Sequence, residues 1–355
     1  MWFIVHYYCR YLPEPWNYMY YSFDKLFSFP FMFAFCVGSR GCGKTFNAKV
    51  WCLNRFLKTG EQFVYLRRYK TELDPALSSF FDDLQSNGYF EDYDLKVCKS
   101  KMLTSFKCNG QICGYAAALS TANILKSTAF PKVTTIIFDE YILDTACGVY
   151  KYLRDEPTQL LEFVESVFRL RTGHVLFLGN CVNFYGCPYT GFFNLTLPFN
   201  SEFKSFKDGL IVVNYIDNEQ YRNYKKQTKF GKLVEGTKYA DYAIDNKSLR
   251  ESEDFIEKRP PDSKFNGILV INGTNIGVWS SKNGNLYLSE KYEPNSWIKL
   301  ACDFNDHTDS TQLLSLRENW IIRYTLTAFK RGWCRFENQK VKAVALPLLN
   351  KCIAI

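Results

Sequence analysis

One short segment constrains this chain more than any other feature. Residues Gly38 to Thr45 fit the pattern Gly-x-x-x-x-Gly-Lys-Thr, with an apolar run from Phe29 to Val37 before it and helical periodicity to about Lys58 after it. A strand, a glycine-rich turn and a helix in this order place backbone N–H groups and the positive end of a helix dipole around an anion. The sequence therefore predicts a loop that binds nucleotide phosphates.

Each residue type in this loop has an expected task. Lys44 is predicted to neutralise β- and γ-phosphate oxygens, and the Thr45 hydroxyl is predicted to be a ligand of Mg²⁺. The glycines let backbone N–H groups approach the phosphates closely. The predicted nucleotide-binding residues are Gly38, Ser39, Arg40, Gly41, Cys42, Gly43, Lys44 and Thr45.

A pair of carboxylates follows a second apolar run. Val133 to Phe138 is β-branched and aromatic, as in a strand buried on both faces, and Asp139 and Glu140 come directly after it. Asp139 is predicted to hold Mg²⁺, and Glu140 is predicted to polarise the attacking water, which favours hydrolysis over a switch function. The guanine-specifying pattern Asn-Lys-x-Asp does not follow, so ATP is expected rather than GTP.

Two further positions invite a functional interpretation. Asn180 follows the predicted strand at 175–178 and is expected to contact the γ-phosphate or the attacking water, although a turn role is also open. Arg169 and Arg171 end a helix that begins at Pro157. They either complement the helix dipole or provide an arginine finger to a neighbouring subunit, and spacing alone does not decide between these.

The alternation of strands and helices predicts an α/β P-loop ATPase domain with a central parallel sheet. After Pro260 and Pro261 the pattern changes to hairpins, which predicts an α+β C-terminal domain. Other expected elements are a helix over 74–86, a β-meander over 95–118 and a helix over 311–330. The expected parts are an N-terminal arm (1–28), the ATPase domain (29–218), a basic linker or lid subdomain (219–255) and the C-terminal domain (256–355).

Composition narrows the setting. The 44 basic and 36 acidic residues give a formal charge of +8, which favours a polyanionic partner without requiring one. Thirteen dispersed cysteines without a Cys-x-x-Cys pair, and only three histidines, indicate reduced thiols rather than disulfides or a zinc site. The N-terminus lacks signal-peptide features, and no apolar run approaches the ~20 residues that cross a bilayer. No membrane association is expected.

With these motifs in place, the chain resembles the DNA-packaging (encapsidation) ATPases of φ29-like phages. The resemblance rests on the segments 38–45, 60–73, 135–140, 230–239, 255–259 and 262–265. It implies an additional-strand-catalytic-glutamate (ASCE) ATPase that forms a homomeric ring, expected to be a pentamer, at the portal of a prohead. The ring uses ATP to drive double-stranded DNA inward. The resemblance also implies that Arg169 is the trans-acting finger and that Lys126 acts across the subunit interface.

The resemblance further implies an RNase H-like C-terminal domain without nuclease activity. Asp303, Asp306 and Asp309 form the one acidic cluster there, and turn or N-cap duty is the expected role. Alternatives are a terminase-type motor with an active nuclease and a nucleotide-binding assembly protein without turnover. The expected location is the host cytoplasm, with transient docking at the portal vertex and absence from the mature virion.

A translocating motor must grip DNA without reading its sequence, so contacts to phosphates are expected. The alternative for each candidate is a solvated surface charge. Some φ29-like systems also use a packaging RNA, and the sequence leaves that partner open. The candidate DNA contacts are Arg67, Arg68, Lys70, Lys225, Lys226 and Lys229.

Overall fold

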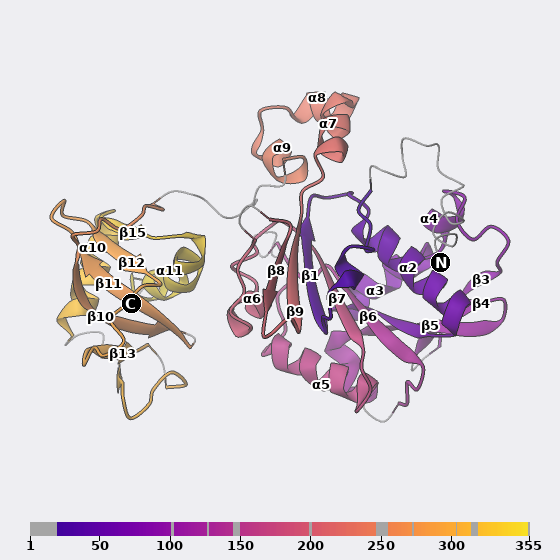
Figure 1. The fold of residues 1–355 in the computed structure, drawn as a ribbon, viewed down its shortest axis with the longest axis horizontal. Helices are drawn as coiled ribbons and strands as arrows, with labels where there is room; N and C mark the ends of the chain where they lie inside the picture. Colours follow the sequence, from indigo (N-terminus) through magenta and orange to yellow (C-terminus); the bar gives the residue numbers. More distant parts are fainter. Residues whose placement is uncertain are drawn as a thin grey trace. The chain divides into compact units, whose positions relative to one another are not determined.

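The chain forms two compact units, each built around its own sheet (Figure 1). The first unit comprises Met1–Phe184 and Leu197–Arg250, and the second comprises Tyr185–Thr196 and Glu251–Ile355. The computed structural model describes residues 20–100, 103–125, 128–144, 150–198, 201–245, 255–271, 273–302, 304–313 and 319–353.

The first unit contains a nine-stranded sheet in the order β3-β4-β5-β2-β6-β7-β1-β9-β8. The strands from β5 to β9 in this order are parallel to their neighbours, whereas β3, β4 and β8 join the edges in antiparallel pairs. The parallel sheet predicted from the sequence is confirmed. The strands are β1 (Phe33–Gly38), β2 (Gln62–Arg67), β3 (Leu95–Cys98), β4 (Thr104–Cys108), β5 (Gln111–Ala118), β6 (Val133–Asp139), β7 (His174–Asn180), β8 (Phe203–Phe206) and β9 (Ile211–Ile216).

Strand β7 lies between β1, which precedes the phosphate loop, and β6, which ends at the carboxylate pair. This intervening strand is the additional strand of the predicted ASCE arrangement. Helix α2 (Lys44–Thr59) links β1 to β2, and helix α5 (Glu156–Phe168) links β6 to β7. These two crossovers run in opposite directions along the sheet, so the right-handed rule places the two helices on opposite faces.

The packing of β1 shows why the sheet is buried on both faces. All six residues of the strand are buried. Ala34 and Cys36 belong to the core cluster that contains Leu53 of α2, whereas Phe35 stacks on Phe177 with ring centroids 4.0 Å apart. Alternate side chains of one strand therefore fill two separate apolar layers, which explains the unbroken apolar run.

Glycines at both ends of α2 set its length. Gly43 (φ 90°) precedes the first residue of the helix, and Gly60 (φ 75°) follows the last, both in the left-handed region. Glycine adopts this region without a steric penalty. The phosphate loop therefore leads directly into a 16-residue helix, as the motif predicts.

Residues after β9 form three short helices within the first unit: α7 (Glu219–Gln227), α8 (Lys229–Val234) and α9 (Lys238–Ala243). Each helix has a side-chain N-cap, provided by Asn218, Thr228 and Thr237 respectively. Such caps satisfy backbone donors that a short helix leaves free. This segment overlaps the basic region that the sequence analysis expected to be a linker or lid.

The second unit contains a six-stranded sheet in the order β14-β13-β10-β11-β12-β15. Strands β10 to β12 form an antiparallel meander, and β13 and β14 add in parallel beside β10. Strand β15 adds in parallel beside β12, so the second unit is a separate domain that combines strands and helices, as predicted. The elements are β10 (Lys264–Ile271), β11 (Thr274–Ser280), β12 (Leu286–Ser289), β13 (Lys299–Ala301), β14 (Gln312–Leu313), α10 (Trp320–Lys330), β15 (Cys334–Phe336) and α11 (Gln339–Ile353).

Two predicted helices differ from the structure. The segment 74–86 is divided into α3 (Lys70–Ser78) and α4 (Asp82–Gln85), and α3 begins earlier than predicted, where Tyr69 N donates to Glu72 Oε2 (3.0 Å). The segment 311–330 begins with β14, and the described part of its helix, α10, starts at Trp320, where the Asn319 side chain accepts from Ile321 N. Among the described residues, no helix is long and apolar enough to cross a membrane.

Candidate nucleotide site

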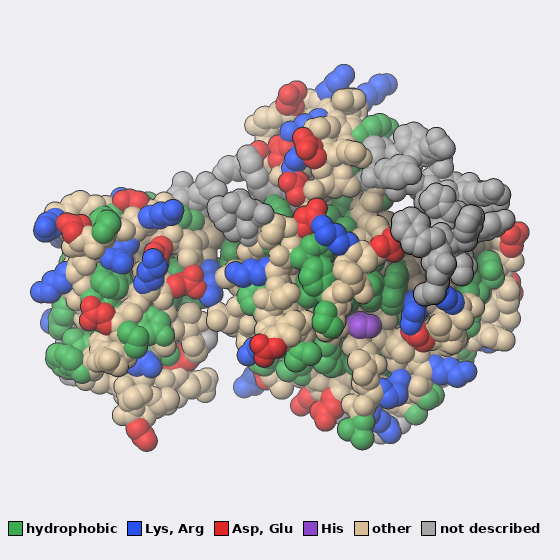
Figure 2. Space-filling model, in the orientation of Figure 1, with side chains coloured by type: hydrophobic (Ala, Val, Ile, Leu, Met, Phe, Trp, Pro, Cys, Tyr) green, Lys and Arg blue, Asp and Glu red, His purple; other side chains and the backbone are tan. Residues whose placement is uncertain are grey.

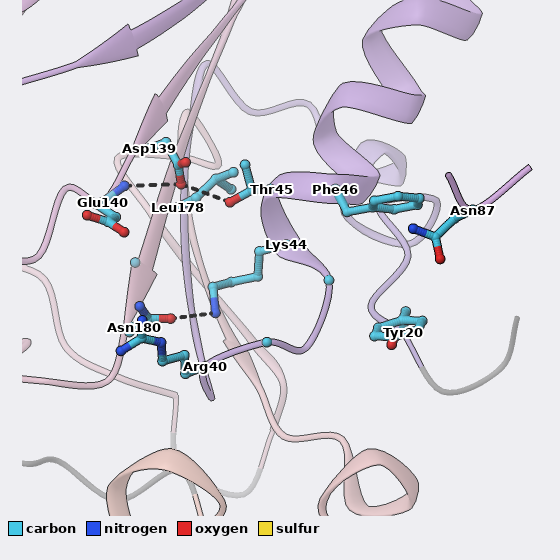
Figure 3. Close-up of a pocket in the computed structure, with 13 residues that line it drawn as sticks. Tyr20, Arg40, Lys44, Thr45, Phe46, Asn87, Asp139, Glu140, Leu178 and Asn180 are labelled. Carbon is cyan, nitrogen blue, oxygen red and sulfur yellow. Dashed lines mark hydrogen bonds between the residues drawn. The ribbon is translucent and has the colours of Figure 1, made fainter. Parts of the chain in front are cut away.

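A cavity of about 350 Å³ lies at the carboxyl ends of β1, β6 and β7, where the phosphate loop enters α2 (Figure 3). Parallel sheets typically bind ligands at this edge. The cavity brings together the predicted loop, carboxylates and asparagine with residues that the sequence analysis did not select. The lining residues are Tyr20, Arg40, Gly41, Gly43, Lys44, Thr45, Phe46, Asn87, Asp139, Glu140, Leu178, Gly179 and Asn180.

Lys44 is buried at the start of α2 and its ammonium group points into the loop. Its Nζ donates to the carbonyl oxygens of Gly38 (3.1 Å) and Ser39 (2.8 Å) and to Asn180 Oδ1 (3.2 Å). Asn180 lies directly opposite Gly38 in the β1–β7 register. The predicted lysine and asparagine therefore share one point of the cavity.

Thr45 and Asp139 meet on the side of the cavity toward β6. Thr45 Oγ1 donates to Asp139 Oδ1 (2.9 Å), and Tyr65 on β2 donates to Asp139 Oδ2 (2.8 Å). Burial, followed by the charge of Asp139, raises the pKa of Tyr65 well above its ordinary value, so the phenol stays protonated and donates. The side chain of Asp139 is therefore held by neighbours on two elements.

Arg67, at the end of β2, bridges both carboxylates. Its guanidinium donates to Asp139 Oδ2 (3.2 Å) and to Glu140 Oε2 (2.8 Å), and its side chain is only 11% exposed. Glu140 has a φ of 57°, and its backbone N–H donates to Asp139 Oδ1 (3.2 Å). The structure contradicts the predicted DNA contact of Arg67, because this cation is turned inward and paired within the site.

Arg68 is also wrongly predicted as a DNA contact. Its side chain is 1% exposed, and Nε donates to Glu156 Oε2 (2.7 Å), a carboxylate with no exposure. The other guanidinium nitrogens donate to the carbonyls of Glu140 (3.2 Å) and Tyr141 (2.8 Å). Arg68 therefore forms a buried ion pair and supports the backbone of the carboxylate loop.

The two arginines after α5 have different surroundings. Arg169 is exposed with a φ of 52°, and the following Leu170 is fully exposed. Arg171 donates to the carbonyls of Phe130, Pro131, Val133 and Val167. The Arg171 guanidinium is thus occupied within its own subunit and holds the segment that follows α5 against the loop before β6. Arg169, in the same segment, is exposed at the surface.

The basic residues of α7 and α8 divide into inward and outward positions. Lys225 donates to the carbonyls of Arg40 and Ala243 (both 2.8 Å), and burial, with the positive charges of Arg40 and Lys44 nearby, lowers its pKa. These contacts occupy the Lys225 ammonium within its own subunit, which disfavours a direct DNA contact by this residue. Lys226 pairs with Asp245 (2.6 Å) and remains half-exposed.

Lys229 is exposed on α8, and Lys70 is exposed at the start of α3. Figure 2 shows that basic side chains stand on the outer surface around α7 and α8, with acidic ones between them. A surface of mixed charge neither supports nor contradicts DNA binding, so the DNA contacts of Lys70, Lys226 and Lys229 stay predictions.

Five lining residues are not among the predicted site residues: Tyr20, Phe46, Asn87, Leu178 and Gly179. Phe46 follows the loop motif directly, so its position beside Thr45 was a usable signal. Tyr20 and Asn87 come from segments far away in the chain, and only the fold places them at the cavity.

Two other predicted sets lie partly outside the described residues. Lys126 and Asp303 fall there, so the structure gives no account of them. Asp306 Oδ1 accepts from Gly273 N (2.6 Å), a contact to a residue 33 positions away rather than the local turn or N-cap role that was predicted. The described part of the chain contains no group of three or more His, Cys, Asp or Glu residues suited to a metal ion.

Comparison with known proteins gives one consistent result. The family model described as Podovirus DNA encapsidation protein (Gp16) matches residues 17–354. The DNA packaging protein of Bacillus phage phi29 is 35% identical over 336 residues, which cover 94% of this chain and 98% of the relative. That of Bacillus phage B103 is 34% identical over 333 residues, with 93% and 98% coverage.

Two solved structures agree with these relatives. A chain of the bacteriophage Phi-29 viral genome packaging motor assembly matches with a TM-score of 0.72 and 33% identity, over 94% of this chain and 99% of that one. A chain of the Phi-28 gp11 DNA packaging motor shares the fold, with a TM-score of 0.60, 19% identity, and coverage of 94% and 96%.

Proposed function

The chain belongs to the podovirus DNA encapsidation protein family, and from this premise we propose that it is an ATP-hydrolysing motor that moves double-stranded DNA into a viral prohead. The observation that carries the proposal is one cavity in which Lys44, Thr45, Asp139, Glu140 and Asn180 converge. These side chains come from the ends of β6 and β7 and from the start of α2.

The residues fit ATP with Mg²⁺. Thr45 Oγ1 and Asp139 Oδ1 lie 2.9 Å apart, which brings a hydroxyl and a carboxylate together as the hard oxygen ligands that Mg²⁺ prefers. When bound, the ion neutralises charge on the phosphate oxygens. Lys44 exchanges its carbonyl partners for phosphate oxygens, and the N-terminus of α2 faces the same anion.

Glu140 is the proposed general base. Its carboxylate is 52% exposed and lines the cavity, so water can reach it. Because Oε2 accepts from Arg67, Oε1 is the atom that takes a proton from the attacking water. Arg68 holds the carbonyl of Glu140 and thereby orients the loop that presents this carboxylate.

We further propose a homomeric ring, of five subunits, that docks at the portal of the prohead from the host cytoplasm and is absent from the mature virion. Arg169 is the proposed finger toward the neighbour's γ-phosphate. Its support is an exposed position in the segment that Arg171 holds against the loop before β6. Lys126 stays a proposal from the family resemblance alone, and a packaging RNA is a further proposed partner.

DNA is proposed to contact exposed lysines through its phosphates, with Lys70, Lys226 and Lys229 as the remaining candidates. The second unit contributes no nuclease step to this proposal. Cleavage of DNA that depends on Mg²⁺ or Mn²⁺ and disappears on Asp303→Ala would contradict it.

The decisive experiment compares wild type with Glu140→Gln in a packaging assay. Purified proheads, DNA and ATP are mixed, and phosphate release and DNA protected from added nuclease are measured. Glu140→Gln is expected to bind ATP normally and to lose both signals, because the amide cannot accept the proton. Hydrolysis that survives this change would refute the assigned base, and ATP binding without turnover in wild type would favour an assembly protein instead.

A further inference from the structure

The cavity extends beyond the part that the phosphate loop accounts for. Lys44, Asp139 and Glu140 lie on one side, whereas Tyr20, Phe46 and Asn87 lie together on the other, beyond the turn into α2 (Figure 3). Two aromatic rings and one amide bring no positive charge to a phosphate chain. They are suited to a flat heterocycle with polar edges, since bases stack on aromatic side chains and are read by amides.

The aromatic walls are fixed from outside the cavity. The Phe46 ring packs edge-to-face against Tyr89, with centroids 5.2 Å apart. A Cβ on Gly43 would lie 3.0 Å from Tyr20 Cβ, so Tyr20 rests against the phosphate loop itself. Tyr21 N donates to the Cys42 carbonyl (3.0 Å), which fastens this segment to the same loop.

Asn87 is held in one orientation. Its Nδ2 donates to the Asp83 carbonyl (2.6 Å), and the amide cannot be reversed, because two oxygens at that distance would repel. The Asp83 carboxylate is in turn paired with the buried Lys49 of α2 (2.7 Å). Asn87 Oδ1 has no hydrogen-bond partner among the described residues, so it presents an acceptor at the cavity.

We propose that Tyr20, Phe46 and Asn87 form the nucleobase subsite, and that Asn87 Oδ1 selects adenine by accepting a hydrogen bond from its 6-amino group. Guanine carries an acceptor oxygen at the same position, which would face the acceptor of Asn87. This inference rests on the proposed function, because it takes ATP as the ligand of the phosphate half.

The test uses four ligands with the full-length protein: ATP, purine riboside triphosphate (which lacks the 6-amino group), ITP (which has a 6-oxo group) and tripolyphosphate. Wild type is expected to bind ATP roughly three- to tenfold more tightly than purine riboside triphosphate, as one modest hydrogen bond predicts, and ITP more weakly still. Asn87→Leu is expected to bind ATP and purine riboside triphosphate equally, because neither finds an acceptor.

Gln85→Leu is the matched control, since Gln85 lies on α4, is absent from the cavity lining and donates to Tyr93 instead. It should keep the wild-type preference. Phe46→Ala should weaken all three nucleotides together and leave tripolyphosphate binding unchanged. A preference for the 6-amino group that survives Asn87→Leu would overturn the inference. If the wild type bound neither tripolyphosphate nor ATP, that result would instead overturn the proposed nucleotide site.

Discussion

Replacing Arg68 by methionine tests whether this residue is a buried ion-pair partner, as the structure indicates, or a DNA contact. Arg68 and Glu156 are 1% and 0% exposed, and the substitution would leave the Glu156 carboxylate without its buried cation. Removing one partner of a buried ion pair typically costs about 3–5 kcal/mol. For a unit of this size, that loss corresponds to a melting temperature lower by roughly 6–20 °C.

The double variant Arg68→Met, Glu156→Met completes the test. Replacing both charges by apolar side chains is often neutral, so this variant should regain most of the lost stability. It would still lack the donors to the Glu140 and Tyr141 carbonyls, so its ATP turnover should remain low. Lys70→Met, at an exposed neighbouring site, is the control and should stay within about 0.5 kcal/mol of wild type.

Urea unfolding followed by circular dichroism would measure stability, and fluorescence anisotropy with a labelled duplex would measure DNA affinity. The expected pattern for Arg68→Met is a lower unfolding midpoint. An unchanged midpoint together with weaker DNA binding would refute the buried role and restore Arg68 as a DNA contact.

Two further predictions concern the surface and the core. In rings that mix wild type with Arg169→Ala, packaging should fall because each variant subunit abolishes ATP hydrolysis at its neighbour's site. ATP binding by the isolated variant should stay normal. A loss of hydrolysis confined to the variant's own site would exclude a trans role. Burial raises the pKa of Cys36, Cys113 and Cys334 to about 12. These thiols should therefore react with DTNB only after unfolding, whereas the partly exposed Cys98 and Cys302 react first.

The sequence was sufficient for residues whose task depends on local order. Gly43, Lys44 and Thr45 lie at the start of a helix that follows a strand, and Asp139 ends a buried strand, as the local pattern predicts. The same reasoning places Asn180 beside Lys44, because adjacent parallel strands end at one edge.

Sequence reasoning failed for residues whose role depends on the direction in which the side chain points. Arg67 and Arg68 are successive residues at the end of β2, and both looked like surface charges. The structure turns one toward Asp139 and Glu140 and the other toward Glu156. These partners are about 70 to 90 residues away in the chain, so no local pattern could reveal them. The same distance concealed Tyr20 and Asn87 from a reading of the loop motif.

The position of β7 sets the distance between the phosphate loop after β1 and the carboxylates after β6. Neighbouring strands are about 4.8 Å apart, so the ends of β1 and β6 are separated by roughly 9–10 Å. Asn180 ends the strand between them, with Lys44 on the β1 side and the carboxylates of Asp139 and Glu140 on the β6 side. If β6 were next to β1, the loop and the carboxylates would be only about 4.8 Å apart, which would leave less room between them for the proposed water and terminal phosphate.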